Sequence, residues 1–121
     1  MTREETTRAL FRACETGDVD TVRSCLDHGA DVNASDNHGN LAIHLAILGY
    51  NYDTALFLLC NGADPITRNR NGASPLDLVA SSQDGEEDME IRRGRERIID
   101  WYREHHPELV MGKYVSGPGG L

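Results

Sequence analysis

The chain has 121 residues, of which 39% are hydrophobic, and its 20 acidic and 12 basic side chains give a formal net charge of −8. This length and composition predict one small domain with a modest core. The acidity argues against a general nucleic-acid surface, which needs clustered Lys and Arg to displace counterions from phosphates. No apolar run approaches the length of a membrane span, and residues 1–5 lack the apolar segment of a signal peptide, so we expect no membrane partner.

The three cysteines give no disulfide pattern. Cys14 and Cys25 occupy apolar positions of predicted helices, and Cys60 has no evident mate. Unpaired thiols of this kind are typical of a reducing compartment. We therefore expect a cytoplasmic or nuclear protein.

A segment of the chain recurs after thirty-three residues. Gly-Ala-Asp at residues 29–31 returns at residues 62–64, and apolar positions superpose at the same offset, as Leu10, Ile43 and Leu76 do. Within each unit several apolar residues lie at i, i+3, i+4 spacing, which places them on one face of a helix. Because one unit cannot bury such a face alone, neighbouring units must stack on each other.

Capping residues divide each unit into two helices. In the first unit Asp18 can cap a second helix that begins at Val19, and Gly29 ends that helix with a left-handed residue. Gly62 ends the second helix of the next unit in the same way. The Ser-Pro pair at residues 74–75 opens a third first helix, with serine as the N-cap and proline at the first helical position.

Two turn-rich segments, residues 36–39 and 69–72, separate the units and predict projecting hairpins. With the Gly-Ala-Asp motifs and the Ile-His-Leu-Ala run at residues 43–46, they give a sequence that resembles the ankyrin repeat over roughly residues 3–82. The resemblance implies an all-α solenoid of stacked helix-turn-helix units with short hairpin-like loops. It also implies a structural role for His44, which would hydrogen-bond near the turn.

Three positions depart from the pattern of that family. Leu41 stands where a threonine usually caps the helix, Tyr50 takes a position usually given to glycine, and Asp77 replaces the histidine found at His44. Loss of a capping hydroxyl weakens a helix start by about 1 kcal/mol, which a packed stack can absorb. The fold prediction therefore stands.

After Gln83 the thirty-three-residue register fails, and an offset of forty-three residues restores it. The longer offset aligns Ile98, Trp101 and Tyr102 with apolar positions of the second unit, which implies an insert near residues 84–93. We expect an acidic loop that leads into a longer terminal helix, with one or both aromatic rings sealing the end of the core. The insert is either a plain polar loop or a binding or regulatory element.

These observations predict one repeat domain over residues 1–106. Its units fall at about residues 3–35, 36–68 and 69–106. We expect Pro107 to stop the last helix and residues 107–121 to form a glycine-rich flexible tail, with a docked strand-like peptide as the alternative.

Catalytic and metal sites find little support in the sequence. His105 and His106 are adjacent, so on a helix they point about 100° apart, and no cysteine or third histidine follows at ligand spacing. The sequence does not bring a nucleophile, a base and an orienting group together. We therefore expect no enzyme activity, no metal and no cofactor.

The sequence thus predicts a non-catalytic module that binds another protein. In ankyrin repeats the binding surface is the concave face, which consists of the hairpin tips and the exposed positions of the first helices. The resemblance assigns partner binding to Asn37, His38, Asn40, Arg70, Asn71 and Ala73 at the tips and to Glu15, Thr16, Leu48, Gly49, Ser81 and Ser82 on the helices. Leu48 is apolar where the family exposes the position to solvent, and Arg70, with Arg68, could pair with an acidic group on a partner.

Two alternatives stay open. The chain is expected to be a monomer, but it could instead be a self-associating scaffold whose end pairs with a second copy. It could also be an inhibitor that occludes the site of a partner enzyme. Separately, Asn33 resembles the asparagines that hydroxylases modify in ankyrin repeats, and we predict it as a modification site.

Overall fold

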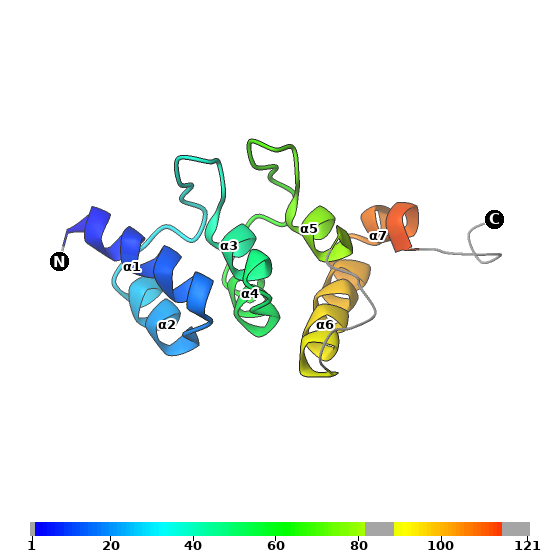
Figure 1. Cartoon of the computed structure of the whole chain (residues 1–121), viewed down its shortest axis with the longest axis horizontal. Helices are drawn as coiled ribbons and strands as arrows, with labels where there is room; N and C mark the ends of the chain where they lie inside the picture. Colours follow the sequence, from blue (N-terminus) through cyan, green and yellow to red (C-terminus); the bar gives the residue numbers. More distant parts are fainter. Residues whose placement is uncertain (1, 82–88, 115–121) are drawn as a thin grey trace.

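The computed structural model describes residues 2–81 and 89–114, with side-chain surroundings as far as residue 110. Across these residues the chain is helical and forms no strand (Figure 1). The helices are α1 (Arg3–Thr16), α2 (Val19–Asp27), α3 (Ala42–Leu48), α4 (Tyr52–Cys60), α5 (Pro75–Ser81), α6 (Met89–His105) and α7 (Pro107–Tyr114). The all-α prediction is confirmed.

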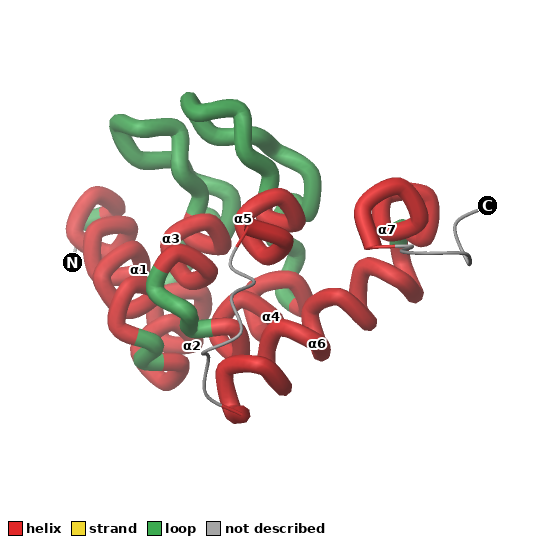
Figure 2. The backbone as a smooth tube through the Cα atoms, turned by 45° about the vertical axis from the view of Figure 1, so that its right-hand side comes forward, coloured by secondary structure: helices red, strands yellow, loops and turns green. Residues whose placement is uncertain are grey.

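The helices pair, and the pairs stack side by side (Figures 1 and 2). Helix α1 packs on α2, α3 packs on α4, and α1, α3 and α5 form a continuous row. The loops that lead into α3 and α5 project from the same edge of this row. One core runs through the stack, and its large fully buried apolar side chains are Leu10, Val22, Ile43, Ile47, Tyr52, Leu58, Leu76, Val79, Ile98 and Tyr102.

Helices α2 and α5 begin at the capping residues that were predicted from the sequence. The backbone N–H of Thr21 donates to Asp18 Oδ1 at 3.1 Å, which caps α2. At the start of α5, Asp77 N–H donates to Ser74 Oγ at 3.1 Å, and Ser74 N–H donates to Asp77 Oδ2 at 3.0 Å. This reciprocal pair satisfies two otherwise unbonded amides, so the aspartate that replaces the family's histidine serves as a cap.

Left-handed residues end the helices, as predicted. Gly29 and Gly62 have φ angles of 92° and 95°. Gly17, at the end of α1, has φ of 80°, and Tyr50, thirty-three residues later, has φ of 61°. Tyr50 is the one residue other than glycine with positive φ in the described part of the chain. Tyr50 therefore adopts a left-handed backbone conformation that the preceding unit gives to a glycine.

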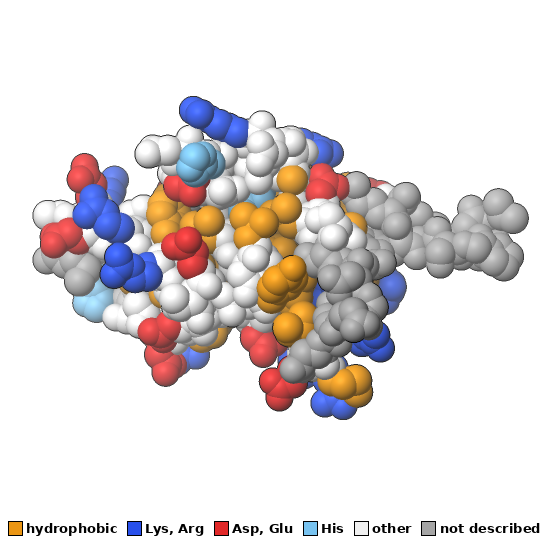
Figure 3. All heavy atoms as spheres, in the orientation of Figure 1, with side chains coloured by type: hydrophobic (Ala, Val, Ile, Leu, Met, Phe, Trp, Pro, Cys, Tyr) orange, Lys and Arg blue, Asp and Glu red, His pale blue; other side chains and the backbone are white. Residues whose placement is uncertain are grey.

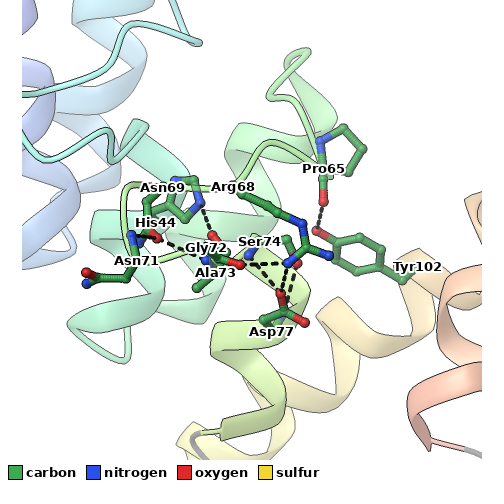
Figure 4. A network of polar contacts seen from close by, with 10 residues as sticks. All are labelled: His44, Pro65, Arg68, Asn69, Asn71, Gly72, Ala73, Ser74, Asp77 and Tyr102. Atoms are coloured by element: carbon green, nitrogen blue, oxygen red, sulfur yellow. Dashed lines mark hydrogen bonds and ion pairs between the residues drawn. The ribbon is translucent and has the colours of Figure 1, made fainter.

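A hydrogen bond to His44 compensates for the capping hydroxyl that Leu41 lacks. Its backbone N–H donates to Nδ1 of His44 at 2.9 Å, and its own side chain is 4% exposed. Since Nδ1 accepts this bond, we assign the ring proton to Nε2, which lies 3.1 Å from the carbonyl oxygen of Ala73 (Figure 4). His44 thus ties the start of α3 to the second hairpin, which confirms its structural role. Burial lowers the pKa of His44 and keeps the ring neutral.

Asn33 joins the first two units. Its Nδ2 donates to the carbonyl of Gly62 at 3.2 Å, and its Oδ1 accepts from the backbone N–H of Asp64 at 2.7 Å. The position thirty-three residues later is Ile66, whose side chain is 54% exposed and cannot make these bonds. The bond pattern between units therefore changes in the third unit, as the register does.

Helix α6 does not pack in the way that the repeat predicts. It lies mainly against α4 and only slightly against α5, the helix with which the repeat would pair it. Gly94 permits the close approach, because a Cβ added there would lie 2.8 Å from Tyr52 Cβ. Ile98 and Tyr102 are fully buried, and the Tyr102 hydroxyl donates to the carbonyl of Pro65 at 2.6 Å (Figure 4). Tyr102 is thus the ring that enters the core, while Trp101 is half-buried.

The prediction of a flexible tail from residue 107 is wrong for residues 107–114, which form α7 on α6. Pro107 ends α6 but occupies the first position of α7, where its missing N–H leaves no bond unmade. Val110 is 3% exposed, so this helix also buries an apolar side chain. Residues 115–121 lie outside the described residues. Of the predicted insert at residues 84–93, residues 84–88 also lie outside the described residues, and residues 89–93 form the start of α6.

Candidate functional site

The row of α1, α3 and α5 and the two hairpins form one continuous face, which we call the concave face (Figures 1 and 2). Because the units repeat every thirty-three residues, equivalent side chains align across it. Near the ends of the helices Glu15, Leu48 and Ser81 align and are all exposed. Thr16 and Gly49 form the next row and are exposed too, while Ser82, their counterpart, lies outside the described residues. The backbone thus presents five of these six positions to solvent.

Four of the six predicted tip residues are exposed: Asn37, His38, Arg70 and Asn71. The other two are half-buried and bonded within the protein. Asn40 Oδ1 accepts from Asn69 Nδ2 at 2.9 Å, and the Ala73 carbonyl lies 3.1 Å from His44 Nε2. These two residues position the tips, which leaves the four exposed ones as candidates for partner contact.

Side-chain oxygens hold the backbone of each tip. Asp36 Oδ1 accepts from the N–H groups of His38 and Asn40 at 2.8 and 2.9 Å. In the second hairpin Asn69 Oδ1 accepts from the amides of Asn71 and Ala73, both at 3.0 Å. Such turns fix the loop before any partner arrives, which reduces the entropy cost of binding.

The two hairpins also contact each other. The N–H of Arg70 donates to the carbonyl of His38 at 3.1 Å. A side chain at Gly39 would lie 3.0 Å from the Arg70 nitrogen, and Gly39 has φ of 74°, so glycine is required there. The Arg70 guanidinium makes no hydrogen bond or ion pair within residues 2–81 and 89–114. The backbone of Arg70 is therefore anchored while the residue is exposed to solvent.

Arg68, predicted to act beside Arg70, is partly bonded within the protein. Its Nη1 donates to Asp77 Oδ2 at 2.9 Å and to the carbonyl of Gly72 at 2.6 Å (Figure 4). The guanidinium therefore joins the second hairpin to the start of α5. Arg70 is thus the less committed of the two arginines, although the side chain of Arg68 is also largely exposed.

An apolar area lies at the centre of the concave face, over α3 and toward α5 (Figure 3). Leu48 is 53% exposed, and Leu45 and Leu78 are half-buried beside the core. The predicted set omitted Leu45 and Leu78, although the thirty-three-residue offset that relates them could have found them three residues before Leu48 and Ser81. It also omitted Tyr50, which is 52% exposed.

Two of the three cysteines, Cys14 and Cys25, are buried. Burial raises the pKa of Cys14 to about 12 and also raises the pKa of Cys25. A thiol with a raised pKa stays protonated and is a poor nucleophile. These two side chains therefore act as small apolar core residues, while Cys60 is exposed.

The rings of both adjacent histidines lie near Trp101, but only His105 stacks on it. The His105 ring stacks on Trp101 with centroids 4.3 Å apart, and His106 Nδ1 lies 3.6 Å from Glu108 Oε2. Among the described residues, no three His, Cys, Asp or Glu side chains are grouped to hold a metal ion. Over the same residues, no helix combines the length and apolarity needed to cross a membrane.

Comparison with known proteins agrees with this architecture. A family model described as ankyrin repeats, in three copies, matches residues 1–69. The chain is 37% identical over 73 residues to BCL-6 corepressor-like protein 1 of Homo sapiens and 38% identical over 77 residues to the 2-5A-dependent ribonuclease of Homo sapiens. It is 43% identical over 53 residues to the NF-kappa-B inhibitor cactus of Drosophila melanogaster.

These similarities cover 60%, 63% and 43% of this chain but only 4%, 10% and 11% of the three relatives. The shared part is thus a small segment of each larger protein.

Proposed function

Because the chain belongs to the ankyrin repeat family, whose repeats mediate protein–protein interaction, we propose that it is a non-catalytic module that binds a partner protein through its concave face. The observation that carries the proposal is Leu48, an apolar residue that is 53% exposed at the end of α3, the middle helix of that face. Burial of such a side chain against a partner contributes about 1.5–3 kcal/mol at most. The rigid hairpin tips and the uncommitted Arg70 guanidinium supply polar contacts at its edge.

Affinity capture with two double variants tests the proposal. Leu48→Asp with Arg70→Glu changes the apolar centre and the charged tip of the concave face. Met89→Asp with Arg93→Glu makes the same chemical changes at exposed residues of α6, away from α3 and the hairpins. Both variants should keep the helical circular dichroism spectrum of the parent chain.

We expect proteins that the parent chain captures to be lost from the concave-face variant and retained by the α6 variant. If both variants capture the same proteins as the parent, the concave face does not bind them and the proposal is wrong. Loss from both variants to the same degree would also contradict it, because the charge change alone would then explain the result.

The similarity to the NF-kappa-B inhibitor cactus favours one second candidate. The chain would then be an inhibitor whose concave face occludes a functional site of its partner. With the captured partner in hand, an activity assay of that partner separates the two functions. Inhibition that saturates with one chain per partner supports the inhibitor, and unchanged activity in the saturated complex supports a simple binding module.

We further propose that the chain acts as a monomer in the cytoplasm or nucleus. The unpaired state of Cys14 and Cys25 supports a reducing compartment. Light scattering should give a mass that does not change with concentration. A mass that doubles as the concentration rises would favour the self-associating scaffold instead.

A further inference from the structure

A groove of about 430 Å³ lies in the first unit, along α1 and the start of α2. Arg8, Ala9 and Arg12 of α1 line it, and Asp18 and Thr21 line it where α2 begins. No residue of α3 or of a later helix stands among its described lining residues. The groove therefore belongs to the outer end of the helix row.

The corresponding surface of the second unit is covered by the first. Asp18 corresponds to Asn51, whose Nδ2 donates to two carbonyls at the end of α1, at 3.1 and 2.9 Å. Arg8 corresponds to Leu41, which is 4% exposed. In the first unit this surface is open, and two arginines stand where the second unit has leucines.

Arg8 and Arg12 lie one helical turn apart, and both are exposed. Neither side chain makes a hydrogen bond or ion pair with the residues that the structure describes. The bonds from Thr2 and, more weakly, the charge of Arg8 lower the pKa of Glu5, so Arg12 is the freer of the two arginines. Like charges at this spacing repel each other, and a bound anion would remove that repulsion.

The carboxylates that line the groove are occupied as helix caps. Glu5 Oε1 accepts from the Thr2 N–H at 2.9 Å. Asp18 accepts from the N–H of Thr21 at 3.1 Å and from its hydroxyl at 2.6 Å. Glu15, farther along α1, does not line the groove. The arginines thus have no carboxylate partner of their own here.

Arg12 also belongs to the concave face. The thirty-three-residue offset places it in one row with Leu45 and Leu78, the half-buried leucines of the apolar area. Figure 3 shows basic and acidic side chains over α1 and, beside them, the apolar area over α3. A partner segment that crosses from α1 to α3 therefore meets a positive charge and then apolar side chains.

The helix spacing sets the spacing of matching groups on such a segment. Helices α1 and α3 pack directly on each other, and the axes of packed helices lie about 8–10 Å apart. An extended chain advances about 3.3 Å per residue. About three residues of an extended segment therefore separate a group over Arg12 from a group over Leu45.

We propose that the concave face binds a partner segment with an aspartate or glutamate over Arg12 and an apolar side chain about three residues away, over Leu45 and Leu48. The guanidinium of Arg12 can bind both oxygens of the carboxylate, and Arg8 adds a second positive charge beside it. This proposal rests on the proposed function and specifies the chemistry of the partner. It adds Arg8 and Arg12 to the residues predicted from the sequence.

Nuclear magnetic resonance of the full ¹⁵N-labelled chain tests the site with defined peptides. The probes are Asp-Ala-Ala-Leu and Leu-Ala-Ala-Asp, acetylated and amidated at their ends, because the segment can run in either direction. At least one should give saturable shifts of the Ala9, Arg12, Thr16 and Leu48 amides, and its asparagine counterpart should bind about tenfold more weakly. No saturable shift with either peptide, equal binding of the asparagine counterpart, or shifts confined to other residues would overturn the proposal.

Variants separate binding from folding. Arg12→Gln should weaken binding of the aspartate peptide about tenfold, with the circular dichroism spectrum and melting temperature unchanged, because the residue is exposed and its side chain is unbonded. Arg93→Gln, the same change at an exposed position of α6, should bind like the parent chain. Equal binding by the parent and Arg12→Gln, or equal losses in the two variants, would contradict the proposal.

A charge exchange tests the role of Arg12 directly. Arg12→Glu should prefer the lysine counterpart of the peptide, Lys-Ala-Ala-Leu or its reverse, over the aspartate peptide. A merely structural role of Arg12 would not produce this exchange. Continued preference of Arg12→Glu for the aspartate peptide would mean that other residues bind the carboxylate.

The two proposals fail in different ways. If neither aspartate peptide binds but the Leu48→Asp, Arg70→Glu variant loses its captured proteins, the assignment of an acidic segment is wrong and the proposed function stands. If the peptide binds through Arg12 but the captured proteins are unaffected by the concave-face variant, the carboxylate site stands and the proposed function is wrong.

Discussion

The first two units and the third unit reach the same kind of packing by different means. Helices α1 to α4 follow a thirty-three-residue register, with each apolar position and each left-handed glycine placed by the repeat, except at Tyr50. Helix α6 instead docks on α4 through Gly94, Ile98 and Tyr102, with little contact to α5. A repeat sequence therefore predicts its regular units well, while a divergent end depends on contacts particular to this chain.

The largest expected effect compares a buried isoleucine in each region. Ile43 and Ile98 are both 0% exposed, and truncation of either to alanine should cost about 2–5 kcal/mol of unfolding free energy. Because α6 packs broadly on α4, we expect one cooperative transition in both variants, measured by urea denaturation. A separate early transition in Ile98→Ala would show that the third unit folds independently of the other two.

Gly94→Val should disturb the contact between the regions directly. The added Cβ would lie 2.8 Å from Tyr52 Cβ, so α6 must move or strain, at a cost of about 1–3 kcal/mol. Hydrogen exchange should show faster opening of α6 and α7 than of α1 and α2. The matched control is Arg93→Val, the neighbouring exposed position on α6, where a loss below about 0.5 kcal/mol is expected. Equal losses in the two variants would contradict close packing at Gly94.

The pH dependence of stability tests the role of His44 in the first two units. Because its pKa is lowered by burial, the unfolded chain binds this proton more readily than the folded one. Stability from this group is therefore complete above about pH 6.5, the ordinary value for histidine, and is lost as pH falls toward the folded pKa. His44→Ala should cost about 1–3 kcal/mol at neutral pH, since the Leu41 amide and the Ala73 carbonyl lose their partner.

The His44→Ala variant should also lose that part of the acid sensitivity, measured by denaturation between pH 7 and pH 5. An unchanged slope in His44→Ala would mean that another group causes the sensitivity.

Tyr102→Phe removes one bond between the third unit and the second. The hydroxyl donates to the Pro65 carbonyl at 2.6 Å, and the ring itself stays buried in the variant. We expect a loss of about 0.5–1.5 kcal/mol in thermal or chemical unfolding. No measurable loss would indicate that solvent replaces the bond at Pro65.

Arg97→Ala should have the smallest effect. Its ion pair with Asp53 joins α6 to α4, but both side chains are more than half exposed, so we expect about 0.2–1 kcal/mol. The loss should shrink further at high salt. A loss comparable to that of Gly94→Val would mean that charge, rather than close packing, holds the third unit in place.

The sequence predicted helices α1 to α4 almost completely, because the same residue pattern occurs in both of the first two units. The caps at Asp18 and Ser74 and the left-handed Gly29 and Gly62 follow from local chemistry, and the structure confirms them. The role of His44 came from the resemblance to the ankyrin repeat, and its two bonds agree with it. The exposure of Leu48 was expected from the resemblance to the ankyrin repeat, and the residue is 53% exposed.

The remaining features depend on contacts between distant residues. Pro107 was predicted to stop a helix, which it does, but that α7 would then pack on α6 is set by tertiary contact. The sequence likewise gave no sign that Arg68 would bond to Asp77, or that Gly94 would meet Tyr52 across forty-two positions.

Hydrogen exchange of the chain with and without a captured partner tests the proposed binding face most directly. The account predicts slower exchange at both hairpin tips, around His38 and Arg70, and at the end of α3 around Leu48. It predicts unchanged exchange along the second helices α2 and α4. Protection confined to α2 and α4, with the tips and α3 unaffected, would contradict it.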